Sequence, residues 1–554
     1  MKQLGQFYRP LAAAVAAVVL AGGGARAFAQ APHDHDGADH FGSVRFETSC
    51  SAAVQPQFDR AVAMVHSFFY PETEKAFRAI AEREPSCAMA YWGIAISVRP
   101  NPLTAPFLPA NLKRGWEAIQ QGRAVATATA RERAWIEALA PFFEGYETVD
   151  QRTRTRRYAA AMASLHDRYP ADREASVFYA LSLLEAVDLT DTTYASQLKA
   201  AAILDPLAAQ QPDHPGIVHY MIHAYDYAPI AAKGLPAARR YAQLAPSAPH
   251  ALHMPSHIFS TMGMWQEAIE TNLAADRANI SYFSSTTPAL ANNVSAIVGR
   301  YHALDFLTYA YLQLAQDGRA REILDQRNRL GQMPPESNIT AHTAFAAIPV
   351  RNAIERGAWK EAAAIAPIRT PYPQAEAIVW FGRVVGAARS GDRQAASDDL
   401  RQIARLQRDL AAPTGDPYWA EQVAILETAA TAWVDLASGR TAEAVSGMRS
   451  AADREDHTEK HVGMENRLWP LREQLAEVLL EAGQPREALK EFEASLRKVP
   501  NRFRSLAGAA RAAAAAGDRR AAESYYRQLL TLAAKADGER PELKAASAYL
   551  AAAR

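Results

Sequence analysis

The sequence contains little of what several specialised protein classes require. Among 554 residues it has only two cysteines, 28 glycines and 32 prolines, and 60 basic residues balance 60 acidic ones. This composition excludes a collagen-like chain, a disulfide-rich scaffold and a wholly disordered chain. The balanced charge also gives no reason to expect binding to nucleic acid or to an anionic membrane surface. A globular or repeat protein remains.

An apolar run near the N-terminus is too short to span a membrane. Two basic residues precede the run 11–20, and the triplet Ala-Phe-Ala at 27–29 follows it. This order is typical of a signal peptide, and the run is about half of the roughly 20 residues that a membrane span requires. We therefore expect a signal peptide over residues 1–29 and a periplasmic or secreted protein without a membrane span.

Residues 30–52 predict a flexible arm. His33, His35 and His40 stand close to aspartates in a segment that also contains Gly, Ala and Pro. Such a segment is either a metal-collecting arm or a solvated tail.

The two cysteines, Cys50 and Cys87, form a candidate disulfide in an exported protein. The bridge would stabilise the fold by on the order of 3–4 kcal/mol in the chain-entropy model. Two buried thiols are the alternative.

Amphipathic segments with a period of 3.6 residues recur from residue 57 to the C-terminus, which predicts an all-α protein. Near the C-terminus a shift of 34 residues aligns a glycine, an alanine and an aromatic residue: Gly483 with Gly517, Ala488 with Ala522, and Phe492 with Tyr526. This period resembles that of tetratricopeptide (TPR) repeats, which implies a right-handed α-α superhelix, or solenoid. The Pro-rich stretch 332–338 predicts a division into an N-terminal TPR-like array with a histidine-lined groove, 53–331, and a C-terminal TPR array, 332–554.

Histidines recur at the same spacing in two adjacent repeats. His219, His223 and Asp226 share one face of the predicted helix 216–226. A shift of 34 residues aligns His219 with His253 and His223 with His257. His250 lies one turn before His253. We expect all six side chains on one concave wall, because the first helix of each repeat lines the groove in TPR superhelices.

This pattern suits a transition-metal site. Two histidines at i and i+4 present two nitrogens to one cation, and Asp226 can act as a third ligand or as the acceptor that fixes a tautomer. Imidazoles favour zinc or copper over magnesium or calcium. The alternative is a polar groove in which the imidazoles hydrogen-bond to one another or to a peptide. His66 and His302 are possible additional members, provided that the superhelix curls far enough; otherwise they are structural.

Four segments also resemble an exported bacterial group of TPR proteins: 87–93, 212–216, 219–226 and 249–259, the last reading PHALHMPSHIF. The resemblance implies the fold, the compartment and the histidine boxes, but no reaction. We expect a binding or scaffold protein whose groove holds a metal, a peptide, a protein or a small molecule. The alternative is a metal-dependent hydrolase or oxidoreductase in which Asp226 or a nearby carboxylate is the base. A zinc protease is not expected, because the 219–223 pair lacks the glutamate base.

Overall fold

The computed structural model describes residues 40–99, 101–286, 294–331, 333–413, 415–465 and 467–552. The expected signal peptide and residues 30–39 of the expected arm lie outside these ranges. The described residues contain helices and no strand, which confirms the all-α class. None of these helices is both long enough and apolar enough to cross a bilayer.

The helices of the N-terminal part are α1 Gln55–His66, α2 Tyr70–Arg83, α3 Ala88–Ser97, α4 Pro109–Ala124, α5 Ala130–Phe143, α6 Gln151–Arg168, α7 Arg173–Glu185, α8 Ala195–Gln210, α9 Pro215–Tyr225, the 3-10 turn η1 Ala231–Gly234, α10 Leu235–Leu244, α11 Pro249–His253, α12 Pro255–Thr261, α13 Trp265–Thr286, α14 Val294–Gln313 and α15 Asp317–Leu330. Those of the C-terminal part are α16 Ile339–Glu355, α17 Trp359–Ala363, α18 Pro373–Arg389, α19 Arg393–Leu410, α20 Pro417–Ala437, α21 Thr441–Asp456, α22 Leu471–Glu481, α23 Pro485–Lys498, α24 Phe503–Ala515, α25 Arg519–Leu532 and α26 Pro541–Ala552.

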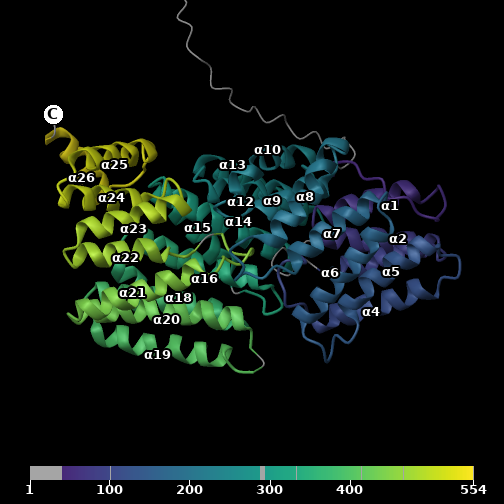
Figure 1. Ribbon diagram of the computed structural model, residues 1–554, viewed down its shortest axis with the longest axis horizontal. Coiled ribbons are helices and arrows are strands. Elements are labelled where there is room, and N and C mark those ends of the chain that lie inside the picture. The colour runs from purple at the N-terminus through teal and green to yellow at the C-terminus, as the bar shows by residue number, and fades with distance from the viewer. Residues whose placement is uncertain are drawn as a thin grey trace, which may run out of the picture. The chain divides into compact units, whose positions relative to one another are not determined.

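Neighbouring helices along the chain pack against each other as stacked hairpins (Figure 1). The 34-residue repeat is clearest in the hairpins α22–α23 and α24–α25. Gly483 and Gly517 occupy equivalent turns with φ of 73° and 82°, a left-handed conformation that glycine adopts without steric cost. Ala488 and Phe492 are fully buried in the first of these hairpins. The predicted helical repeat is therefore confirmed at the level of packing.

One helix, α16, contributes to two apolar clusters. One apolar cluster extends over the N-terminal helices, a second over α16 to α24 and a third over α24 to α26. Ala344 and Ile348 of α16 belong to the first cluster, whereas Ala346 and Val350 belong to the second. Opposite faces of α16 thus connect the two parts.

Residues 40–52 are packed rather than extended away from the helices. Phe41 and Phe46 are buried, and the Phe46 ring lies 4.8 Å from that of Trp135. Cys50 and Cys87 form the expected disulfide, with their Cα atoms 5.0 Å apart. The expected arm therefore becomes part of the folded body from residue 40 onward, because its aromatic side chains find apolar partners.

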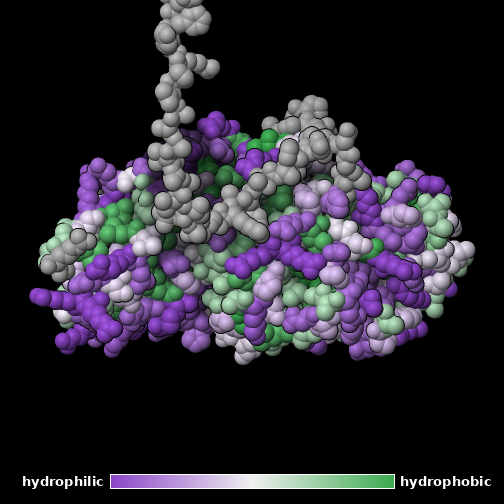
Figure 2. Space-filling model, turned by 90° about the horizontal axis from the view of Figure 1, so that it is seen from above, coloured by the Kyte–Doolittle hydropathy of each residue, from purple (hydrophilic) through white to green (hydrophobic). Residues whose placement is uncertain are grey.

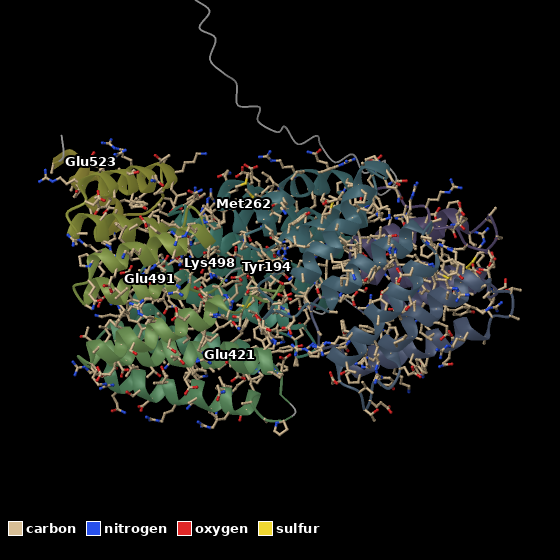
Figure 3. The ribbon with its side chains drawn as sticks, in the orientation of Figure 1. Tyr194, Met262, Glu421, Glu491, Lys498 and Glu523 are labelled. Carbon is tan, nitrogen blue, oxygen red and sulfur yellow. A yellow bond between two sulfur atoms is a disulfide. The ribbon has the colours of Figure 1, made fainter. Side chains whose placement is uncertain are left out.

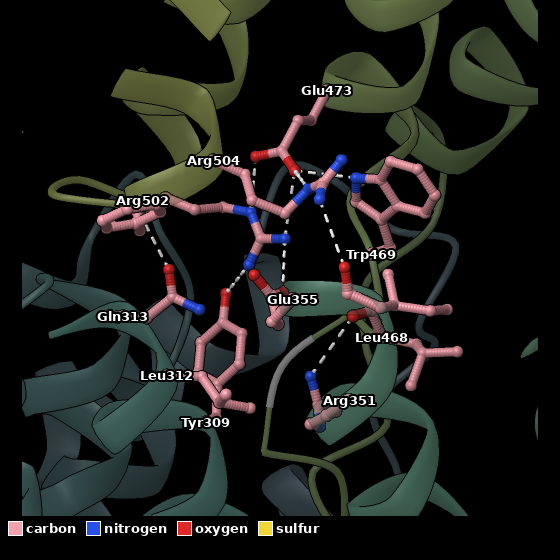
Figure 4. Close-up of polar contacts among 12 residues, drawn as sticks. Tyr309, Leu312, Gln313, Arg351, Glu355, Leu468, Trp469, Glu473, Arg502 and Arg504 are labelled. Carbon is pink, nitrogen blue, oxygen red and sulfur yellow. Dashed lines mark hydrogen bonds and ion pairs between the residues drawn. The ribbon is translucent and has the colours of Figure 1, made fainter. Parts of the chain in front are cut away.

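A buried ionic network joins α24 to α14 and α16 (Figure 4). Arg502 donates to Glu473 of α22, to Glu355 of α16 and to the Tyr309 hydroxyl of α14, each over 2.6 Å. Both carboxylates are fully buried. This network holds the C-terminal helices against α14, the helix that also carries His302.

On the face shown in Figure 2, hydrophilic side chains surround smaller hydrophobic areas. Among the described residues only three large apolar side chains, Leu108, Leu198 and Ile280, are exposed.

Candidate metal centre

Helix α1, the first helix of the described residues, packs against α9. His66, the last residue of α1, is fully buried and contacts Tyr220 of α9, with 2.9 Å between its Nδ1 and the tyrosine hydroxyl. The His66 carbonyl oxygen accepts a hydrogen bond from His219 Nδ1 over 2.6 Å. The curvature needed to bring His66 to the predicted site is therefore present.

We call His219, His223 and His250 the first triad. His219 Nε2 lies 3.1 Å from His223 Nε2 and 3.2 Å from His250 Nε2. His219 and His223 are one turn apart on α9, and His250 comes from α11. One ring nitrogen of each lies within 4.8 Å of the others. Because His219 Nδ1 donates to a carbonyl, its Nε2 carries a lone pair toward the other two rings.

We call His253, His257 and His302 the second triad. His253 Nε2 and His257 Nε2 lie 3.1 Å apart, and all three residues offer a ring nitrogen within 4.8 Å. α11 ends at His253 and α12 begins at Pro255, yet the two paired histidines still lie within contact distance as an i, i+4 pair. His302 comes from α14, so this possible additional residue does join the site.

The two triads adjoin each other. The ring centroids of His223 and His257 are 5.9 Å apart, and those of His250 and His253 are 6.1 Å apart. The five histidines that the repeat pattern brought together, with His302, therefore form one cluster, which we call the histidine centre.

One phenylalanine packs against each triad. The Phe68 ring lies 4.4 Å from His219, 6.0 Å from His223 and 5.3 Å from His250 between centroids. Phe68 has a φ of 53°, which is unfavourable for a bulky side chain and turns the chain sharply after α1.

In the second triad, the Phe306 ring lies 4.8 Å from His253, 5.0 Å from His257 and 5.1 Å from His302 between centroids. The two rings shield the imidazoles from water and restrict their orientation.

Hydrogen bonds at the far nitrogens fix two tautomers of the second triad. Asn272 Oδ1 accepts from His253 Nδ1 over 2.7 Å, and its amide nitrogen donates to the Ala268 carbonyl, which prevents the reverse amide orientation. Asp226 Oδ2 accepts from His257 Nδ1 over 2.9 Å. Both Nε2 atoms consequently present lone pairs to each other at 3.1 Å.

Asp226 belongs to neither triad but is hydrogen-bonded to His257. Its Oδ2 also accepts from Lys460 over 2.8 Å, and its Oδ1 accepts from Thr261 over 3.1 Å. Burial raises the pKa of Asp226, and Lys460 opposes that effect. Of the two roles expected for Asp226, the geometry matches that of the acceptor that orients a ligand, because both oxygens already have partners.

Lys460 reaches the centre from the segment between α21 and α22. The Glu459 backbone N–H donates to the Leu189 carbonyl over 2.8 Å, and the Tyr194 hydroxyl donates to Glu459 over 2.5 Å. Tyr194 is labelled in Figure 3. Two anchors in the loop between α7 and α8 thus place Lys460 beside Asp226.

Burial keeps the imidazoles neutral. Desolvation lowers the pKa of His253 to about 4, and burial together with the neighbouring imidazoles lowers the pKa of His219 and His257 well below the ordinary value. Neutral imidazoles have one lone pair each, which is the form that binds metals. A proton shared between facing nitrogens is therefore disfavoured.

A third cluster, His66, Glu174 and His214, is fully buried and has complete hydrogen bonding. Glu174 accepts from His66 Nε2 over 2.9 Å and from His214 Nε2 over 2.8 Å. The other nitrogens accept, from the Tyr220 hydroxyl and from the Ile217 N–H. Although burial acts in the opposite direction, the two histidines lower the pKa of Glu174. We call this the Glu174 cluster. It is an internal hydrogen-bond network.

The centre is more enclosed than the expected open groove wall. His219 is completely buried, and His223, His253 and His257 are at most 5% exposed. His250 and His302 are partly exposed, so each triad has one member toward solvent. The difference arises because α1 packs on α9 and Phe68 covers the first triad.

Four residues of the site were not expected from the sequence: Asn272, Lys460, Phe68 and Phe306. Phe306 follows His302 by one helical turn and was detectable in principle. Lys460 is 234 residues from Asp226, so no local pattern indicates their contact.

No protein-family model matches the sequence, and no curated protein sequence is significantly similar to it. Solved structures with a similar arrangement include human IFIT1 as a dimer with PPP-AAAA. It is 12% identical with a TM-score of 0.36, and the alignment covers 84% of this chain and 95% of that chain. The TPR domain of P58(IPK) is 15% identical with a TM-score of 0.22, over 69% of this chain and 99% of that chain. The helical-repeat class itself comes from the packing described above.

Proposed function

We propose that this protein is an exported helical-repeat protein that binds a transition metal, zinc or copper, in the histidine centre and acts as a binding or scaffold protein. The observation that carries this proposal is the contact of His253 Nε2 with His257 Nε2 at 3.1 Å while both Nδ1 atoms donate elsewhere. Two lone pairs at this distance repel each other, and a cation between them makes the contact favourable.

The spacing also matches a shared ion. Two nitrogens bound at about 2.0–2.1 Å are about 2.8–3.4 Å apart when the bond angle is about 90–110°. The nitrogen pairs of both triads fall within this range, at 3.1 and 3.2 Å. The signal-peptide pattern and the disulfide support export.

Metal analysis tests the proposal. Protein dialysed against Zn²⁺, or against Cu⁺ without oxygen, should retain near-stoichiometric metal. His219→Asn/His253→Asn removes one central imidazole from each triad and should abolish retention. His342→Asn replaces a buried histidine of α16 outside the centre and should retain all the metal. A metal-free wild-type protein after this treatment would refute the proposal.

An enzyme is the second candidate, supported by the number of ligands. Each triad offers three nitrogens, and catalytic zinc sites have three protein ligands and one open position. Asp226 is poorly placed as the base, because its oxygens are engaged by His257, Lys460 and Thr261. Azide should change the visible spectrum of Co²⁺-loaded protein if a position is open, whereas an unchanged spectrum favours storage or structure.

A further inference from the structure

The histidine centre consists of two equivalent halves, and this equivalence goes beyond the presence of a metal site. Each half has two histidines at i and i+4, a third histidine from another helix, and one phenylalanine against the rings. In the first half the third histidine is His250 of α11, and in the second it is His302 of α14. Each half also has one Nε2 pair at 3.1 Å.

We infer that the histidine centre binds two metal ions side by side, one in each triad, as a pair of copper ions. This inference rests on the proposed function. It specifies the number of bound ions and the metal.

The number of ions follows from the distances. Within a triad the coordinating nitrogens lie within 4.8 Å of one another, and the paired Nε2 atoms are 3.1–3.2 Å apart. Of the two ring pairs given above that join the triads, His223 and His257 are the nearer, with 5.9 Å between their centroids. A single ion with bonds of about 2.0–2.1 Å to nitrogen can use one triad, but it cannot reach all six imidazoles. The second triad would then keep its facing lone pairs without a cation.

An unpartnered nitrogen supports occupation of the second half. Within the described structure, His302 Nδ1 is buried without a hydrogen-bond partner, so it is available as the third ligand of that triad. His223 Nδ1 in the first triad also has no partner, but it is not the nitrogen that faces His219, and an ion bound by the Nε2 atoms would not contact it. The first half is supported instead by the two contacts of His219 Nε2, at 3.1 Å and 3.2 Å.

The charge of the ligands favours copper. The imidazoles are neutral, and among the described residues the one carboxylate that contacts the centre, Asp226, is paired with Lys460. Two divalent ions would add four uncompensated positive charges to a buried site, whereas two Cu⁺ ions add two. Burial penalises charge steeply, and imidazole is a suitable copper ligand.

Copper stoichiometry tests the inference. Protein reconstituted with excess Cu⁺ without oxygen and then dialysed should hold two copper ions per chain. His219→Asn should hold one, because it disables only the first triad, and His253→Asn should also hold one. His342→Asn is the matched control and should hold two. A wild-type value of one, or loss of all copper in either single variant, would overturn the pair.

Two milder variants separate coordination from misfolding. His250→Asn and His302→Asn alter the partly exposed ligand of each triad and should weaken one of the two copper ions at least about tenfold while leaving the other unchanged. Equal weakening of both ions by either variant would contradict independent halves. Crystals of the copper-loaded protein should give two anomalous peaks, one beside Phe68 and one beside Phe306.

The metal assignment has its own test. Equimolar Zn²⁺ added to the Cu⁺-loaded protein should displace less than half of the copper. Displacement of both copper ions by zinc would overturn the choice of copper but not the pair. Absence of any bound metal would instead refute the proposed function, so the two failures are distinguishable.

Discussion

The Glu174 cluster and the histidine centre are both buried, and in each the side chains contact one another. They differ in whether hydrogen-bond donors meet acceptors. In the Glu174 cluster every ring nitrogen meets a complementary group: both Nε2 atoms donate to Glu174, and both Nδ1 atoms accept. In the second triad of the histidine centre, the acceptor nitrogens of His253 and His257 face each other. His66 belongs to the first group through its ring and supports the second through its carbonyl oxygen.

This difference shows that burial of histidines is not by itself a sign of metal binding. Both groups are buried and both lie on packed helices. The distinguishing property is whether donors meet acceptors, because stability alone favours complementary hydrogen bonds. The predictions below test that distinction.

The largest effect expected is stabilisation by metal. Free metal at about a thousand times its dissociation constant should raise the free energy of unfolding by at least about 4 kcal/mol, since the metal binds the folded centre. Chemical denaturation with and without Cu⁺ measures this. His219→Asn/His253→Asn should show no such increase, and an equal increase in this variant would mean that the metal binds elsewhere.

A mutation in the Glu174 cluster should lower the stability of the metal-free protein and leave copper binding unchanged. Glu174→Gln replaces one of two acceptor oxygens by a donor group and leaves one histidine N–H unpaired. We expect a loss of about 3 kcal/mol in unfolding free energy without metal, and unchanged copper stoichiometry. Loss of copper without loss of stability would show that the two groups have been assigned the wrong roles.

An intermediate effect is expected from the support of His253. Asn272→Leu removes the acceptor that fixes its tautomer and should weaken copper binding about 10–100-fold. Asn279→Leu is a matched control on the same helix: Asn279 is also buried and also donates to the carbonyl four residues earlier, that of Ala275. Competition with a chelator measures both affinities, and similar losses in the two variants would rule out a tautomer effect.

The smallest effect concerns a buried carboxyl group outside both clusters. Burial raises the pKa of Glu465 to about 8, although Arg351 opposes this shift. A raised carboxyl pKa contributes stability that is complete below its unfolded-state value and is lost as the pH rises through 8. Wild-type protein should therefore lose about 1 kcal/mol relative to Glu465→Gln between pH 7 and pH 8. Denaturation midpoints for both proteins at the two pH values provide the measurement. The same stability difference between the two proteins at both pH values would show that the pKa of Glu465 is not near 8.

The sequence predicted the parts of the centre that depend on local spacing. Pairs at i and i+4 need only a helix, and the 34-residue shift needs only a repeat, so His219, His223, His253 and His257 were found together. His66 and His302 required the curvature of the helix stack, which arises from packing far along the chain. Lys460 required the contact of Glu459 and Lys460 with the residue before α8 and the residue after α9, which no periodicity encodes.

The position of Lys460 has a consequence for the order of assembly. A polypeptide synthesised only as far as α21 contains all six imidazoles but lacks the ammonium group that compensates Asp226. The carboxylate that orients His257 acquires its counter-ion only when the later segment docks. Maturation of the centre should therefore be a late event in biogenesis, after most of the scaffold has formed.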